Sequence, residues 1–273
     1  MELRGTTGLL TGAAGGLGSE MARRLAREGV TLALSGRNVV GLEQLRGELP
    51  GDGHAVVPGD LESADDVAAL VSKAEEAVGP LDLLVNNAGI ELTAHFTDLT
   101  PAELEQIVQV NLTAPLLLTH RVLPGMLERG RGHVVQISSV AGLVSPAHTE
   151  PYGATKGGLV RLTESLRNEY RDSGVGFSAV CPGFARGAGM YQRMADTGQV
   201  APKLLGTTSD EKVAADVVSA VVRDRAVVVS NSQPVRPLLA LGALSPRFIA
   251  WATNRLGANR LMRRAADARR NPQ

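Results

Sequence analysis

The chain has 273 residues, 44% of them hydrophobic, so it is long enough to bury a full core within one α/β domain. A single cysteine, Cys181, excludes an internal disulfide, and no apolar run reaches the roughly 18 residues that a membrane span needs. The formal charge is zero, but eight arginines and one acid give residues 230–273 a charge of +7, which leaves −7 for residues 1–229.

Seven short runs of apolar and β-branched residues predict strands: 9–10, 30–34, 55–57, 81–85, 134–137, 177–180 and 226–229. Between them, apolar residues recur at spacings of three and four, as in Leu17, Met21 and Leu25, which is helical periodicity. Strands that are buried on both faces and alternate with helices form parallel sheets with right-handed crossovers. We therefore expect residues 1–230 to form an α/β domain: a Rossmann-like, doubly wound parallel sheet of about seven strands with helices on both faces.

The turn after the first predicted strand is rich in glycine and precedes an amphipathic helix that starts near Ser19. Glycines let such a turn approach a pyrophosphate closely, while the N–H groups of the helix N-terminus meet its charge. A tight turn without a ligand also needs glycine, so the turn alone is not specific. Within this fold it predicts dinucleotide binding by Gly12, Ala14, Gly15, Gly16, Leu17 and Gly18.

The end of the second predicted strand, Ser35-Gly36-Arg37, indicates which dinucleotide binds. An acid there would bind the ribose 2′-hydroxyl of NAD(H), whereas a basic residue accepts the 2′-phosphate of NADP(H). The next acid, Glu43, lies well into the following helix. Arg37 can make charge-assisted bonds to a phosphate and Ser35 can add a hydroxyl donor, so we expect NADP(H) over NAD(H). The alternative is a solvated loop arginine.

Later motifs agree in order and spacing with the short-chain dehydrogenase/reductase family, which the chain resembles over about residues 5–230. The resemblance includes the family's catalytic tetrad, which is matched here by Asn111, Ser139, Tyr152 and Lys156. Its serine lies 13 residues before its tyrosine, which selects Ser139 over the adjacent Ser138. The resemblance implies further cofactor contacts at Asp60, Leu61, Asn87, Ala88, Gly89, Tyr152, Lys156, Pro182 and Gly183.

The spacing of Tyr152 and Lys156 suits proton transfer, because residues four apart on a helix share a face. Only about a thousandth of free tyrosine is phenolate at neutral pH, and a neighbouring positive charge lowers the phenol pKa by about 1–3 units. Tyr152 can then act as a base in alcohol oxidation or, when protonated, as an acid in carbonyl reduction. Ser139 can donate to the substrate oxygen. By resemblance, Asn111 holds the helix and a water that connects Lys156 to solvent.

Two departures from the family concern the cofactor. After Pro182-Gly183 the family places a threonine that anchors the nicotinamide, but residues 184–190 contain no hydroxyl. Backbone groups or Arg186 could substitute for it. The basic residue that some NADP-dependent members carry in the glycine turn is also absent, so the prediction of NADP(H) rests mainly on Arg37.

Three segments predict the substrate pocket: Val140, Ala141, Leu143 and Val144 after the serine, residues 91–96, and the loop with Met190, Tyr191 and Met194. They are mostly apolar, so a lipophilic ketone, aldehyde or alcohol fits better than a sugar, although core packing explains the same residues equally well. His95 and His148 match no catalytic position of the family, and we expect both to be surface histidines.

Residues 231–273 run past the end of this fold as a basic amphipathic extension in which prolines and glycines separate short helices. Such a segment can lie in a membrane interface with Trp251 at the headgroup level, fold over the substrate cleft, or pack on another subunit. Because amphipathicity is the default of any surface helix, we favour packing on the domain or on a partner. The N-terminus shows no apolar signal segment, so we expect a cytoplasmic protein, with peripheral membrane contact as the alternative.

We expect an oxidoreductase that transfers a hydride between NADP(H) and the carbonyl or alcohol of an apolar small molecule. An alternative enzyme is a 3-oxoacyl-thioester reductase of lipid metabolism, whose acidic carrier protein the basic extension could meet. An alternative of another class is a non-catalytic dinucleotide-binding regulatory protein. We expect no metal site and no nucleic-acid partner, since the extension has too few aromatic residues to stack on bases. By resemblance we expect a homodimer or homotetramer joined through the helices that begin near Leu104 and Tyr152.

Overall fold

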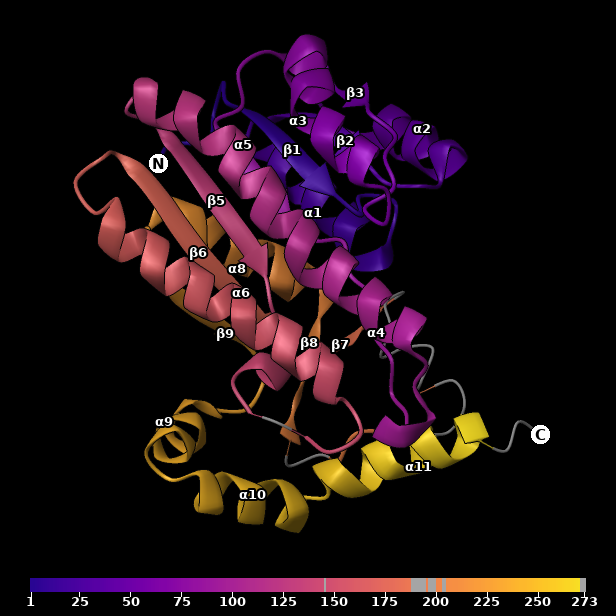
Figure 1. The fold of residues 1–273 in the computed structure, drawn as a ribbon. Helices are drawn as coiled ribbons and strands as arrows, with labels where there is room; N and C mark the ends of the chain where they lie inside the picture. Colours follow the sequence, from indigo (N-terminus) through magenta and orange to yellow (C-terminus); the bar gives the residue numbers. More distant parts are fainter. Residues whose placement is uncertain (145, 188–194, 196–199, 203–204, 271–273) are drawn as a thin grey trace.

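Seven parallel strands form the centre of the protein in a computed structural model that describes residues 1–144, 146–187, 195, 200–202 and 205–270 (Figure 1). Their order is β3-β2-β1-β4-β5-β6-β9, and all neighbouring pairs are parallel. The winding reverses between β1 and β4, the place where doubly wound sheets open a ligand crevice. The predicted Rossmann-like fold is confirmed. The strands are β1 (Thr7–Thr11), β2 (Thr31–Ser35), β3 (Ala55–Val56), β4 (Leu83–Asn86), β5 (Gly132–Ile137), β6 (Val175–Pro182) and β9 (Val227–Ser230).

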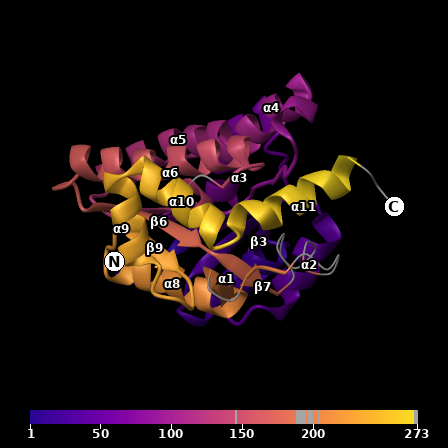
Figure 2. The same cartoon turned by 90° about the horizontal axis from the view of Figure 1, so that it is seen from below.

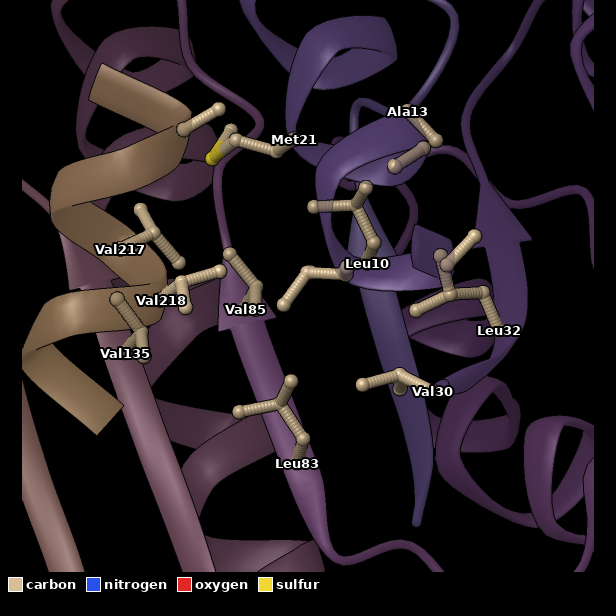
Figure 3. Close-up of a cluster of buried hydrophobic side chains, with 14 of the residues drawn as sticks. Leu10, Ala13, Met21, Val30, Leu32, Leu83, Val85, Val135, Val217 and Val218 are labelled. Atoms are coloured by element: carbon tan, nitrogen blue, oxygen red, sulfur yellow. The ribbon is translucent and has the colours of Figure 1, made fainter. Parts of the chain in front are cut away.

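Successive residues of a strand point to opposite faces of the sheet, and here both faces are apolar. A layer of helices therefore covers each face. Leu10 and Val85 belong to a core cluster with Met21 and Val218 (Figure 3). The neighbouring Leu9 belongs to a second cluster. The first layer contains α1 (Gly16–Arg27), α2 (Val39–Glu48) and α8 (Asp210–Val222). The second contains α3 (Ala64–Val78), α5 (Ala114–Glu128) and α6 (Glu150–Glu169).

A single turn of π-helix, η2 (Gln109–Thr113), connects α4 (Pro101–Val108) directly to α5. Thr100 and Glu103 form a capping box that fixes the start of α4, with Pro101 in its first turn. π-Turns of this kind are frequent at functional sites. Here the turn contains Asn111, which is fully buried.

The predicted C-terminal extension is present as three helices, α9 (Arg236–Leu244), α10 (Pro246–Arg255) and α11 (Ala258–Arg270). They lie together at the carboxyl end of the sheet, beyond the tips of the strands (Figures 1 and 2). A small two-stranded sheet of β7 (Phe184–Arg186) and β8 (Thr207–Ser209) stands between them and the main sheet. Among the described residues, no helix is both long and apolar enough to cross a membrane.

Ion pairs attach α11 to the first turn of α4 and to the segment before it, which includes η1 (Phe96–Asp98). Arg270 binds Asp98 at 2.7 Å and Arg269 binds Glu103. Oδ1 of Asp267 accepts a hydrogen bond from Nε2 of His95 at 2.8 Å. His95 keeps 26% of its side chain exposed at the surface, and the returning C-terminal helix supplies its partner. His148 is also half-buried and packs edge-on against His95, with ring centres 4.9 Å apart.

Candidate active site

The glycine turn between β1 and α1 forms one end of a cavity of about 460 Å³. Gly12 has φ of +63°, and a Cβ there would lie 2.9 Å from Cα of Ala88, so only glycine fits this close approach. Gly15, which caps α1, provides no side-chain hydrogen bond, and the first turn of α1 contains no acid. The first N–H groups of α1 thus suit an anionic group. Of the residues predicted from this turn, Gly12, Gly15, Gly16, Leu17 and Gly18 line the cavity, whereas Ala14 packs against the core.

Asn87, directly after β4, holds this turn in place. Its side-chain nitrogen donates to the carbonyls of Thr11 and Gly12 at 2.9 and 3.1 Å. The backbone N–H groups of Asn87 and Ala88 donate to the Thr11 hydroxyl at 3.0 and 3.1 Å. The Asn87 amide is thus engaged within the protein, and with Ala88 and Gly89 it forms the floor of the cavity.

The end of β2 forms the rim beside this turn. Ser35, Arg37, Asp60 and Leu61 all line the cavity, as predicted. The Arg37 side chain is 64% exposed, and its Nη1 lies 3.1 Å from Oε1 of Glu62. Sequence reasoning missed Glu62, because nothing in its neighbourhood along the chain indicates a partner 25 residues earlier. The guanidinium is thus held at the rim and remains accessible to a phosphate.

Ser139, Tyr152 and Lys156 meet in the middle of the cavity, where β5 ends. Lys156 Nζ donates to the Ile137 carbonyl at 2.9 Å and lies 5.8 Å from the centre of the Tyr152 ring. Ser139 lies beside Tyr152 in the cavity, and its side chain acts to lower the pKa of the Tyr152 phenol. The adjacent Ser138 instead donates to the carbonyl of Lys156 at 2.7 Å and so fastens β5 to α6. This arrangement agrees with the choice of Ser139.

Asn111 stands behind these residues and does not line the cavity. Its Oδ1 accepts the N–H of Ile90 and its Nδ2 donates to the Ile90 carbonyl, both at 2.8 Å. A Cβ on Gly89 would lie 3.2 Å from both Asn111 Oδ1 and Lys156 Nζ. Glycine at this position keeps the space between the Asn111 amide and the Lys156 ammonium open. The water that the family resemblance implies would lie in this region.

Burial dominates the protonation of the tyrosine and the lysine. It raises the pKa of Tyr152, the carboxylate of Glu91 raises this pKa further, and the Ser139 hydrogen bond opposes both. Burial also lowers the pKa of Lys156 to about 8. We expected Lys156 to lower the pKa of Tyr152, but this pKa is raised, because the loss of hydration on burial outweighs the charge of Lys156, whose Nζ lies 5.8 Å from the ring centre.

The far end of the cavity has an apolar wall that the C-terminal helices supply: Leu238, Leu239, Ile249, Leu256 and Met262. Val140, Ala141 and Val144 line the opposite side, as predicted. The prediction of Leu143 is wrong, because this side chain packs against Val160 and Cys181. Within 91–96 only Glu91 lines the cavity, and the predicted Met190, Tyr191 and Met194 lie outside the described residues.

Pro182 and Gly183 line the cavity where β6 ends, and Asn231 lies beside them. Sequence reasoning missed Asn231. Its Nδ2 donates to the Leu205 carbonyl at 2.9 Å, while its buried Oδ1 has no hydrogen-bond partner in the described part of the chain. A Cβ on Gly183 would lie 2.8 Å from that oxygen, so a larger residue there would displace the Asn231 side chain.

An uncapped helix N-terminus, a basic rim and buried polar side chains beyond them, all at the switch point of a Rossmann-like sheet, define a dinucleotide-binding oxidoreductase. The chain belongs to the short chain dehydrogenase family, whose pattern it matches over residues 6–198. Members of this family use a nicotinamide dinucleotide, and the glycine turn and rim of this chain fit one.

Curated relatives include oxidoreductases and ketoacyl reductases. The chain is 39% identical over 254 residues to the ketoacyl reductase HetN of a Nostoc species, covering 90% of this chain and 88% of HetN. It is 38% identical over 188 residues to the oxidoreductase UcpA of Escherichia coli, covering 68% and 71%. A solved actinorhodin polyketide ketoreductase with NADPH superposes with a TM-score of 0.74 at 30% identity, covering 82% of this chain and 95% of that one.

Proposed function

We propose that the protein is an NADP(H)-dependent reductase that converts the carbonyl of an apolar small molecule to an alcohol, and that it also catalyses the reverse reaction. One observation carries this proposal: Ser139, Tyr152 and Lys156 line a single cavity between the glycine turn and an apolar wall. The cofactor, the reacting carbonyl and the apolar part of the substrate would therefore bind next to one another in this cavity. Residues 1–230 form the catalytic domain in this proposal, and residues 231–273 complete its substrate pocket.

The protein side of the reaction is proton transfer. The raised pKa of Tyr152 keeps its phenol protonated at neutral pH, so its Oη can donate a proton to the carbonyl oxygen as charge develops there. Ser139 donates a hydrogen bond to the same oxygen, and Lys156 supplies a positive charge on the same buried wall. Bound NADPH would supply the hydride.

Arg37 supports NADPH over NADH. It is a cation at the end of β2, where residue 36 is a glycine rather than an acid. A guanidinium can bind a 2′-phosphate through two parallel hydrogen bonds. The ketoreductase structure that superposes on this chain was solved with NADPH, which agrees with this preference.

A 3-oxoacyl thioester is the second candidate substrate. The named ketoacyl reductases among the relatives and the apolar wall of α9–α11 favour it, because an acyl chain needs an extended apolar surface. A cyclic or aliphatic ketone needs the same wall but no carrier. The non-catalytic alternative lacks a specific observation in its favour.

We also propose a homodimer or homotetramer joined along α4, α5 and α6. Val108, Leu116 and Leu117 on α4 and α5 are about two-fifths exposed, and a subunit interface along these helices would bury them. Sedimentation of the purified chain measures the subunit number. A monomer would contradict this proposal without affecting the assignment of the cavity.

Steady-state assays test the reaction and its substrate. Purified protein is supplied with NADPH or NADH and with simple ketones, bulky cyclic ketones and 3-oxoacyl thioesters, and loss of the reduced cofactor is followed. We expect turnover of apolar ketones or thioesters and a kcat/KM with NADPH at least about tenfold above that with NADH, since one such phosphate contact is worth ~1.5–3 kcal/mol. Tight NADPH binding without turnover of any carbonyl would favour the regulatory alternative instead.

A further inference from the structure

The C-terminal helices have two different faces. Leu238 and Leu239 on α9, and Ile249 and Thr253 on α10, line the cavity. Other apolar residues of the same two helices point outward: Leu241 is 52% exposed, Leu244 84% and Trp251 60%. Packing on the domain therefore accounts for only one side of the extension.

The outward side is strongly basic as well as apolar. On α10, Arg247, Trp251 and Arg255 follow one another at intervals of four residues, so they form one stripe of the helix. On α11 the exposed residues include Arg260, Arg263 and Arg264. None of these five arginines forms an ion pair within the part of the chain that the structure describes.

The arginines near the end of α11 behave differently. Arg269 and Arg270 bind Glu103 and Asp98, and Asp267, the one acid of the extension, binds His95. The carboxylates near α11 are thus already paired, those of Glu103 and Asp98 with the last turn of this helix. The charge of the five outward arginines remains available to an external partner.

We propose that this outer face, made of Leu241, Leu244, Trp251 and the arginines 247, 255, 260, 263 and 264, binds the surface of an anionic lipid bilayer. Apolar residues that enter the headgroup boundary next to arginines that meet anionic lipid are the pattern of an interfacial helix. Tryptophan prefers this boundary, because its ring is apolar and its N–H is polar. The Trp251 ring lies 5.8 Å from that of Phe248, which widens the apolar surface.

Charge distinguishes this partner from a second copy of the chain. An isologous contact through this face would place five arginines against five arginines, with no acid to separate them. A bilayer with anionic headgroups provides the opposite charge over the whole face. The three helices lie next to one another on one side of the molecule, so they can meet one surface together (Figures 1 and 2).

Bilayer binding would also place the cavity beside the lipid. The helices that carry the outer face form the inner wall of the cavity, so only the thickness of one helix, ~10 Å, separates the two. An apolar substrate that partitions into the bilayer would then be concentrated next to its site. This last step rests on the proposed function, whereas bilayer binding does not.

The chain contains one tryptophan, so its fluorescence reports on this face alone. Full-length protein is titrated with phosphatidylcholine vesicles, with and without phosphatidylglycerol, and both Trp251 emission and co-sedimentation are measured. We expect a blue shift of Trp251 and co-sedimentation with the anionic vesicles, at least about tenfold weaker binding to the neutral ones, and weakening by salt.

Two variants make the test specific. Leu241→Ser combined with Leu244→Ser should weaken binding to anionic vesicles by about tenfold or more, since two apolar side chains no longer enter the boundary. Val40→Ser combined with Val222→Ser changes two exposed apolar residues elsewhere and should leave vesicle binding unchanged. Thermal unfolding and NADPH binding, measured without turnover, confirm that each variant is folded.

Three results would overturn the proposal. The first is absence of co-sedimentation with anionic vesicles. The second is co-sedimentation without a change in Trp251 emission, which would place the contact on another face. The third is a blue shift that depends on protein concentration without lipid, which would identify a second copy of the chain as the occupant.

Discussion

Tyr152 and Lys156 lie one turn apart on α6, with the lysine Nζ 5.8 Å from the centre of the tyrosine ring. Lys156 Nζ is fixed by its bond to the Ile137 carbonyl, and both side chains are less than a tenth exposed. Burial therefore favours the neutral form of each group, which raises the pKa of the phenol and lowers that of the ammonium to about 8. The Tyr152 phenol is thus protonated at neutral pH, which is the form that carbonyl reduction needs.

The rate of reduction should fall above about pH 8. The pKa of Lys156 is about 8, so its positive charge is present below this pH and lost above it. The pH profile of kcat/KM for NADPH reports groups of the free enzyme, and we expect a basic limb near pH 8. Lys156→Arg keeps the charge at every accessible pH, so any activity that it retains should lack this limb. A limb near pH 8 in the arginine variant would assign it to another group.

Gly12→Ala should destabilise the protein, whereas Gly47→Ala should stabilise it. An alanine at position 12 would adopt φ of +63° and place its Cβ 2.9 Å from Ala88 Cα, so we expect a loss of about 2 kcal/mol or more in the free energy of unfolding. Gly47 lies within α2, and a Cβ there has no neighbour within 4 Å, so helix propensity should give a gain of about 0.5–1 kcal/mol. Urea unfolding measures both. An equal change in the free energy of unfolding for the two variants would contradict the close approach at Gly12.

Arg37→Ala should weaken NADPH binding by about ten- to hundredfold, because a charge-assisted bond to the 2′-phosphate is lost. NADH lacks this phosphate, and its dissociation constant should change by less than about twofold. Arg46→Ala removes an exposed arginine of α2 and serves as the control. Cofactor titration by fluorescence measures all three proteins. An equal loss for NADH and NADPH would show that Arg37 acts on the rim rather than on the phosphate.

Leu239→Ser should lower kcat/KM for apolar substrates by about tenfold, because it places a hydroxyl in the apolar wall. NADPH binding should remain unchanged, since the wall lies at the other end of the cavity. Ala240→Ser introduces the same hydroxyl one residue later, on the exposed side of α9, and should have no effect on turnover. If the two variants behave alike, the inner face of α9 does not contact substrate.

The local features of the site could be predicted from the sequence. The alternation of strands and helices predicted the sheet, and the order of strand ends along its carboxyl edge brought Gly12, Arg37, Asn87 and Ser139 to one cavity. The spacing of Tyr152 and Lys156 placed them on one face of α6. Each of these predictions depends on periodicity or on short-range backbone chemistry, which a sequence displays directly.

Features that depend on distant partners could not be predicted. The Arg37–Glu62 pair and the contact of His95 with Asp267, 172 residues later, follow from tertiary packing alone. Leu143 turns into the core because η3 (Val140–Gly142) rotates the chain by one short turn. The protonation of Tyr152 depends on how completely the folded protein removes water, which spacing does not reveal.

The central claim is that Tyr152 transfers the proton, and Tyr152→Phe tests it most directly. The matched control is Tyr170→Phe, at the other end of α6, where the ring packs against Phe177 outside the cavity. We expect Tyr152→Phe to lower kcat for carbonyl reduction by at least about a hundredfold, the contribution of a positioned acid, while the dissociation constant for NADPH changes by less than about threefold. Tyr170→Phe should retain wild-type kcat. A Tyr152→Phe variant with wild-type kcat would contradict the account.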